Sequence, residues 1–160
     1  MAKQSVKNYL RLDKISRTAH SESAVHGTEV LLAGQFVDLG AVLEDTADRE
    51  LVEATKATAG AGFDAIIAPV YIDKGFSDFD IQFESVPAGE PGRAIILENG
   101  SIISINAELA PGISKGDDVA VGTDGLGFAA ITGEEVVVGK CIDIEYEPNV
   151  GNLTVIRISK

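Results

Sequence analysis

The sequence is poor in the residues that usually carry chemistry. Its 160 residues include no tryptophan, one cysteine (Cys141) and two histidines (His20 and His26). One cysteine cannot form an intramolecular disulfide, which argues against a disulfide-stapled secreted scaffold. A chain of this length buries enough surface to fold as one domain without disulfides or metals. Sugar-binding sites in small β domains usually display aromatic platforms, so the lack of tryptophan also argues against that class.

Long apolar runs are absent as well. The first residues, MAKQSVKNYLRLDK, carry positive charge but lack the apolar core of a secretory signal, and no run approaches the length of a membrane span. We therefore expect a soluble protein made in a reducing cytoplasm, with no membrane partner.

Basic residues are scarce outside the N-terminus. The net charge is −12, from 13 basic and 25 acidic residues. Residues 1–17 contain five basic residues against Asp13, a balance of +4, which leaves 8 − 24 = −16 for the remainder. An acidic body repels nucleic acid, so we expect no nucleic-acid partner.

This asymmetry predicts a flexible basic arm over residues 1–25, followed by a single β domain over residues 26–160. The arm either contacts an acidic protein surface or is simply a solvated terminus. The candidate binding residues of the arm are Lys3, Lys7, Arg11, Lys14 and Arg17.

The body consists of short alternating or apolar runs separated by glycine-rich turns. The predicted strands fall within residues 28–34, 35–42, 64–72, 78–86, 117–122, 125–131, 134–147 and 153–159. Residues 44–58 fit a short amphipathic helix or an exposed strand, and the strand is favoured. The pattern predicts an all-β fold: a small β-barrel or β-sandwich of about eight to ten short antiparallel strands, connected as a meander.

The segment RAIILENGSIISIN, residues 93–106, contains the strongest turn signal. Asn-Gly between aliphatic runs is typical of a two-residue type I′ hairpin, here with Leu97 opposite Ile102. Both faces of this hairpin would be apolar, so either a second sheet or a partner protein must cover the second face. The possible interface residues are Ile95, Leu97, Ile102, Ile103 and Ile105.

No catalytic or metal-binding motif is recognisable. The spacing of His20 and His26 matches no helix-face metal motif, Cys141 has no histidine nearby in sequence, and the glycine-rich turns lack the features of a phosphate-binding loop. Acidic clusters such as Asp117-Asp118 do not match a calcium loop. We expect a protein that is not an enzyme and needs no metal or cofactor.

Three stretches together resemble the head decoration, or cement, proteins of tailed bacteriophages. These are HGTEVLLAGQFVDLG (26–40), FESVPAGEPGRAIILENGSIISIN (83–106) and the closing region that begins ISKGDDVAVGTDGLGF (113–128) and runs to residue 159. The resemblance implies a non-enzymatic protein of the virion, made in the host cytoplasm, on the outer surface of the head. Its partner would be the major capsid protein, whose subunit contacts it reinforces, and it would form a homo-oligomer, a trimer or a dimer. The alternatives are another virion β module, in the tail or baseplate, or a cell-surface adhesion domain.

Overall fold

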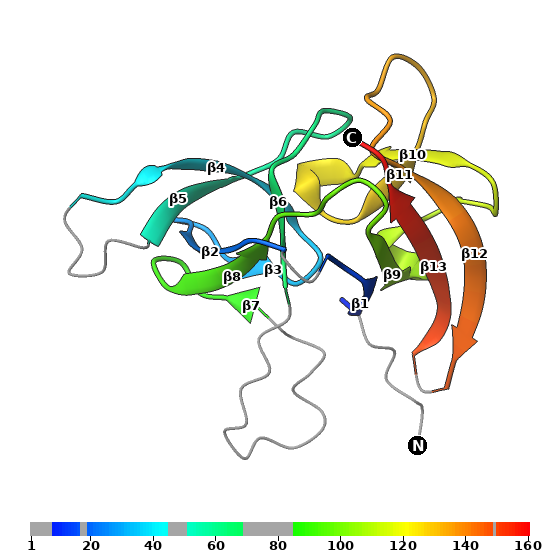
Figure 1. The fold of residues 1–160 in the computed structure, drawn as a ribbon, viewed down its shortest axis with the longest axis horizontal. Coiled ribbons are helices and arrows are strands. Elements are labelled where there is room, and N and C mark those ends of the chain that lie inside the picture. The colour runs from blue at the N-terminus through cyan, green and yellow to red at the C-terminus, as the bar shows by residue number, and fades with distance from the viewer. Residues whose placement is uncertain (1–7, 17–18, 45–50, 69–84, 149) are drawn as a thin grey trace.

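The computed structural model describes residues 8–16, 19–44, 51–68, 85–148 and 150–160. The described residues form an all-β fold, with thirteen strands and two short 3₁₀ turns, η2 (Ala107–Leu109) and η3 (Thr123–Gly125) (Figure 1). The strands are β1 (Leu10–Lys14), β2 (Ser21–Val25), β3 (Leu31–Leu32), β4 (Phe36–Val42), β5 (Leu51–Lys56), β6 (Ala65–Ile67), β7 (Ser85–Val86), β8 (Pro91–Ile95), β9 (Ile102–Asn106), β10 (Asp118–Val121), β11 (Phe128–Ala130), β12 (Gly139–Glu147) and β13 (Gly151–Ile158).

Five strands close into a barrel in the order β2-β5-β4-β6-β8. A barrel of so few strands is narrow, so its interior accepts mainly small side chains. Alanines from four strands point inward, together with a few larger aliphatic residues. They belong to a buried cluster that also includes Leu31 and Val86 of the separate two-stranded sheet β3-β7: Ala24, Leu31, Val37, Ala54, Ala65, Ile67, Val86 and Ala94.

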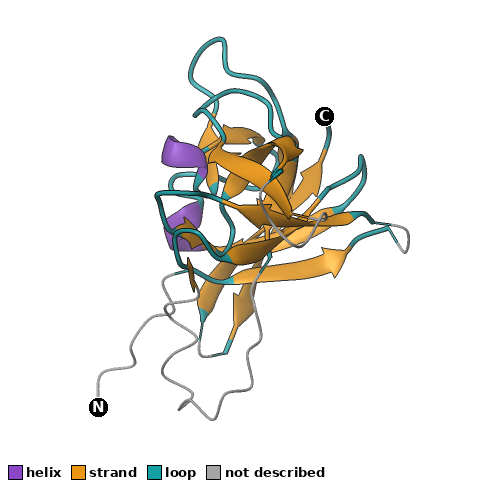
Figure 2. Cartoon of the chain, turned by 90° about the vertical axis from the view of Figure 1, so that its left-hand side faces the viewer, coloured by secondary structure: helices purple, strands orange, loops and turns teal. Residues whose placement is uncertain are grey.

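The other large sheet has six strands in the order β1-β9-β13-β12-β10-β11. Its inner face packs on the outside of the barrel, because side chains of both units belong to one buried core. Figure 2 shows that strands make up most of the described chain and that the two helical turns lie side by side at one edge. Alternation along the barrel strands separates the two cores: Val37 points into the barrel, whereas its neighbour Phe36 joins the core shared with the sheet. Phe36 contacts Phe63 and Phe128, with ring centroids 4.3 and 5.0 Å apart.

A glycine-rich segment of the six-stranded sheet, residues 122–127 between β10 and β11, packs against the chain just before the barrel strand β4. Gln35 forms an isolated β-bridge with Leu126, and its side-chain amide donates to the carbonyl of Asp124 at 2.8 Å. The amide of Gly127 donates to the carbonyl of Gly34 at 3.2 Å. Such close backbone approach leaves no room for side chains, which explains the Gly-Leu-Gly sequence here.

Most strand predictions are confirmed where the structure describes the residues. Residues 51–56 form a strand, which settles the ambiguous segment 44–58 for its described part. Residues 69–84, which include the end of the predicted strand 64–72 and most of the predicted strand 78–86, lie outside the described residues. The predicted strand at 134–147 begins only at Gly139. The meander was wrong, because β2 and β5 pair in parallel and β1 pairs with β9 rather than with β2.

The predicted Asn99-Gly100 hairpin was also wrong. β8 ends in the barrel, where Ile95 pairs with Ser21 and Ile66, while β9 belongs to the six-stranded sheet. The turn itself exists, since the amide of Ser101 donates to the carbonyl of Glu98 at 3.0 Å. Gly100 has a φ of +87°, but Asn99 does not have the positive φ of a type I′ turn. The segment is therefore a crossover between the barrel and the sheet.

Candidate binding surface

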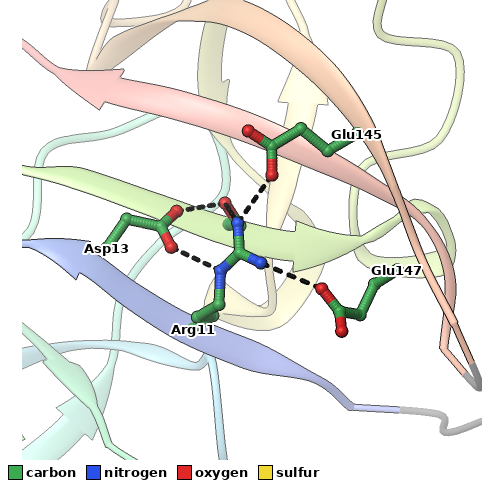
Figure 3. Close-up of polar contacts among 5 residues, drawn as sticks. Arg11, Asp13, Glu145 and Glu147 are labelled. Carbon is green, nitrogen blue, oxygen red and sulfur yellow. Dashed lines mark hydrogen bonds and ion pairs between the residues drawn. The ribbon is translucent and has the colours of Figure 1, made fainter.

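The outer face of the six-stranded sheet carries a charged cluster centred on Arg11 (Figure 3). Arg11 lies on the edge strand β1, and its side chain extends across β9 and β13 to β12. There Nη2 contacts Glu145 Oε2 at 2.7 Å and Nη1 contacts Glu147 Oε2 at 3.1 Å. Nε is paired with Asp13, which also accepts from the hydroxyl of Ser104. One side chain thus links the first and fourth strands of the sheet.

One guanidinium therefore faces three carboxylates, which leaves the cluster two negative charges in excess. The hydrogen bonds to Glu145, and then to Asp13, raise the pKa of Arg11 above its usual value. Ser104, Leu153 and Val155 lie buried on the same face of the sheet. The cluster thus ties the N-terminal strand to the β12–β13 hairpin above a buried layer.

Replacing Arg11 with methionine should destabilise the protein by about 1–2 kcal/mol, because three carboxylates then repel one another without a cation. The loss should shrink at about 1 M ionic strength, where such repulsion is screened. Urea unfolding at low and high salt measures both effects.

Lys140→Met is the matched control, since Lys140 sits 3.8 Å from Asp118 and both side chains are more than half exposed. Its loss should stay below about 0.5 kcal/mol. Equal losses for Arg11→Met and Lys140→Met would mean that the cluster contributes no more than an isolated surface pair.

The opposite face of the β12–β13 hairpin carries exposed apolar side chains. Ile144 and Tyr146 alternate with the acidic residues of β12, and they are 43% and 71% exposed. They are two residues apart on one strand and so point to the same side. This hairpin end presents an apolar pair on one face and the Arg11 cluster on the other.

The flexible-arm prediction was wrong for part of its length. Leu10–Lys14 forms β1, with Leu10 buried in the shared core, and Ser21–Val25 forms β2 of the barrel. Both strands were missed because charged residues interrupt their apolar pattern. Residues Lys3, Lys7 and Arg17 lie outside the described residues. Of the two described candidates, Arg11 is held in its cluster, and Lys14 is exposed beside a shallow hollow lined partly by Glu98 and Asn99.

The proposed interface residues lie mainly inside one copy of the chain. Ile95, Leu97, Ile103 and Ile105 are at most 2% exposed within the shared core, whereas Ile102 is half-buried. Contact between the barrel and the sheet therefore covers these side chains. An interface is not needed to explain apolar residues on both sides of this segment.

The His26 and Cys141 side chains, which were considered from the sequence as candidate site residues, have roles within the fold. His26 Nδ1 accepts from the amide of Glu29 at 3.0 Å, and its carbonyl accepts from the amide of Gly89. Cys141 is buried, and burial raises the pKa of its thiol. Over the described ranges, no group of three or more His, Cys, Asp or Glu side chains is placed to hold a metal ion. Within the same ranges, no helix has the length and hydrophobicity needed to span a bilayer.

Comparison with models of known protein families and with curated protein sequences gives no match. Comparison with solved structures finds a similarity to the head fiber gp8.5 N base of bacteriophage phi29. The TM-score is 0.52 and the sequence identity 15%, over 89% of this chain and 93% of that chain. At this identity the likeness concerns the fold, and it extends over nearly the whole of both chains.

Proposed function

We propose that this protein is a non-enzymatic structural component of a bacteriophage virion, bound to the outer surface of the head, where it stabilises contacts between major capsid subunits. The observation that carries the proposal is the fold shared with a phage head fiber base over 89% of the chain. The sequence resemblance to head decoration proteins supports the same location independently.

The charge distribution is compatible with binding to a protein shell. The chain carries a net charge of −12, which disfavours direct contact with packaged nucleic acid. Assembly on a symmetric head would favour a homo-oligomer, either a trimer or a dimer. Sedimentation velocity of the purified protein measures that state before any capsid is added.

Co-sedimentation with phage heads that lack this protein tests the proposal. We expect binding that saturates at a fixed copy number per head, because a decoration protein occupies a defined set of lattice positions. Heads carrying the protein should also resist heating or chemical disruption better than bare heads. Absence of saturable binding would contradict the proposed function.

The role of the first residues is tested by deleting residues 2–7, which removes Lys3 and Lys7 but leaves β1 intact. If these lysines contact an acidic patch of the capsid, binding should fall several-fold at low salt and the difference should narrow at high salt. The melting temperature should not change. If the deletion does not change head binding at low salt, Lys3 and Lys7 do not contribute to the interaction.

A longer deletion is not an equivalent test. Removing residues 2–14 takes away β1 together with buried Leu10 and the Arg11 cluster. Loss of the Leu10 side chain alone should cost about 2–5 kcal/mol. A binding defect in that variant would therefore report a damaged sheet.

A further inference from the structure

The outer edge of β12 is open along its second half. β12 pairs with β13 over its whole length, but it pairs with β10 only at Gly139 and Lys140. Backbone bonds from the loop at Gly116 and Asp117 extend this contact to Cys141. Beyond that point β12 is the outermost strand of its sheet in Figure 1, and residues 144–147 have no strand partner on that edge among the described residues.

An open edge presents backbone amides and carbonyls that can pair with an added strand. Two features prepare this edge for such pairing. β13 holds the strand in register up to the pair Glu147–Gly151, and Arg11 fixes the acidic face by binding Glu145 and Glu147. A site ordered in advance avoids part of the entropy cost of association.

The side chains on this edge define what a partner strand would need. Ile144 and Tyr146 stand exposed on one face. Asp143, Glu145 and Glu147 line the other face, and the cluster around Arg11 keeps two surplus negative charges. Cross-strand neighbours on the same face interact directly, so apolar residues fit opposite the first face and basic residues opposite the second.

The same charges argue against a second copy of this chain at the edge. Pairing β12 with β12 would place the carboxylates of the two strands on the same face, where like charges repel. An extended segment with alternating apolar and basic residues is complementary on both faces.

We propose that residues 144–147 of β12 form a docking edge for an extended segment of the capsid subunit in which apolar and basic residues alternate. This inference rests on the proposed function and adds the surface and the mode of binding. The added strand would continue the six-stranded sheet beyond β12.

Hydrogen exchange measured on the wild-type protein, free and bound to heads, tests the pairing directly. Backbone amides on the open edge should exchange about tenfold more slowly or better in the bound state, because strand addition protects them. The loop at residues 132–137 serves as the internal comparison and should not change.

A pair of double variants tests the side chains. Ile144→Ser with Tyr146→Ser should weaken head binding about tenfold or more, as expected for the centre of an interface. Val136→Ser with Val137→Ser is the matched control, since those valines are 51% and 43% exposed in a separate loop. Both double variants should melt near the wild-type temperature, because all four side chains are exposed.

The possible outcomes separate the two proposals. If head binding is saturable but the hydrogen-exchange rates of residues 144–147 do not change, the proposed docking edge is wrong. The proposed function would not be affected by that result. Absence of saturable head binding by the wild-type protein would contradict the proposed function. It would also contradict the proposal that a capsid segment pairs with β12. Self-association that depends on Tyr146 and occurs without heads would assign the edge to a second copy instead.

Discussion

Phe36→Ala should lower the free energy of unfolding by about 3–5 kcal/mol, among the largest losses expected for a single substitution in this protein. Phe36 is fully buried and contacts Phe63 and Phe128, so its ring fills the space between the barrel and the six-stranded sheet. Truncation would leave a cavity where the two halves of the fold meet. Urea unfolding followed by far-UV circular dichroism measures the loss.

Val42→Ala is the control on the same strand, because Val42 lies at the end of β4 and is 50% exposed. It should cost less than about 0.5 kcal/mol. The loss of stability for Phe36→Leu should lie between those for Val42→Ala and Phe36→Ala, since leucine retains much of the apolar volume. A loss below about 1 kcal/mol for Phe36→Ala would show that the shared core repacks without the ring.

Gly127→Ala should cost about 3 kcal/mol or more, because both backbone conformation and space exclude a side chain there. Gly127 has a φ of +63°, and a Cβ at this position would lie 2.1 Å from the carbonyl oxygen of Leu109. The backbone would have to move where residues 122–127 of the sheet pack against the chain beside the barrel. Thermal unfolding of the variant measures the cost.

Gly112→Ala separates the cost of the backbone conformation from the cost of the steric clash. Gly112 also has a positive φ, +71°, but no heavy atom lies within 4 Å of the position its Cβ would take. This variant should lose only about 1–2 kcal/mol, the strain of a left-handed residue. If Gly127→Ala and Gly112→Ala lost the same free energy of unfolding, the steric clash between a side chain at position 127 and Leu109 would contribute nothing to the loss.

The existence of most strands could be predicted because alternation and β-branched residues act locally. β13, for example, alternates through LTVIRIS and forms the strand expected. The pairing of strands could not be predicted in the same way. At Asn99-Gly100 the decisive contacts come from β13, since the amide of Gly100 donates to the carbonyl of Ile158 and the amide of Ile158 donates to the carbonyl of Ser101.

The Arg11 cluster was missed for a related physical reason. Arg11 is separated from Glu145 by 134 positions in the sequence, and only the strand order of the folded sheet brings β1 and β12 within reach of each other. The sequence shows the surplus of positive charge near the N-terminus, and from it we predicted a flexible basic arm. The buried position of Leu10 shows why part of that segment folds instead: its apolar contact with the shared core fixes the strand on which Arg11 lies.

The position of β13 has a consequence for how the chain is made. β13 is the last strand in the sequence, yet it lies between β9 and β12 in the middle of the six-stranded sheet. While the ribosome is still synthesising residues 151–158, β9 lacks its neighbour on that side and exposes an incomplete sheet. Pairings between distant parts of a chain form slowly and leave intermediates open to aggregation, so nascent chains stalled before β13 should depend on chaperones far more than chains that include β13.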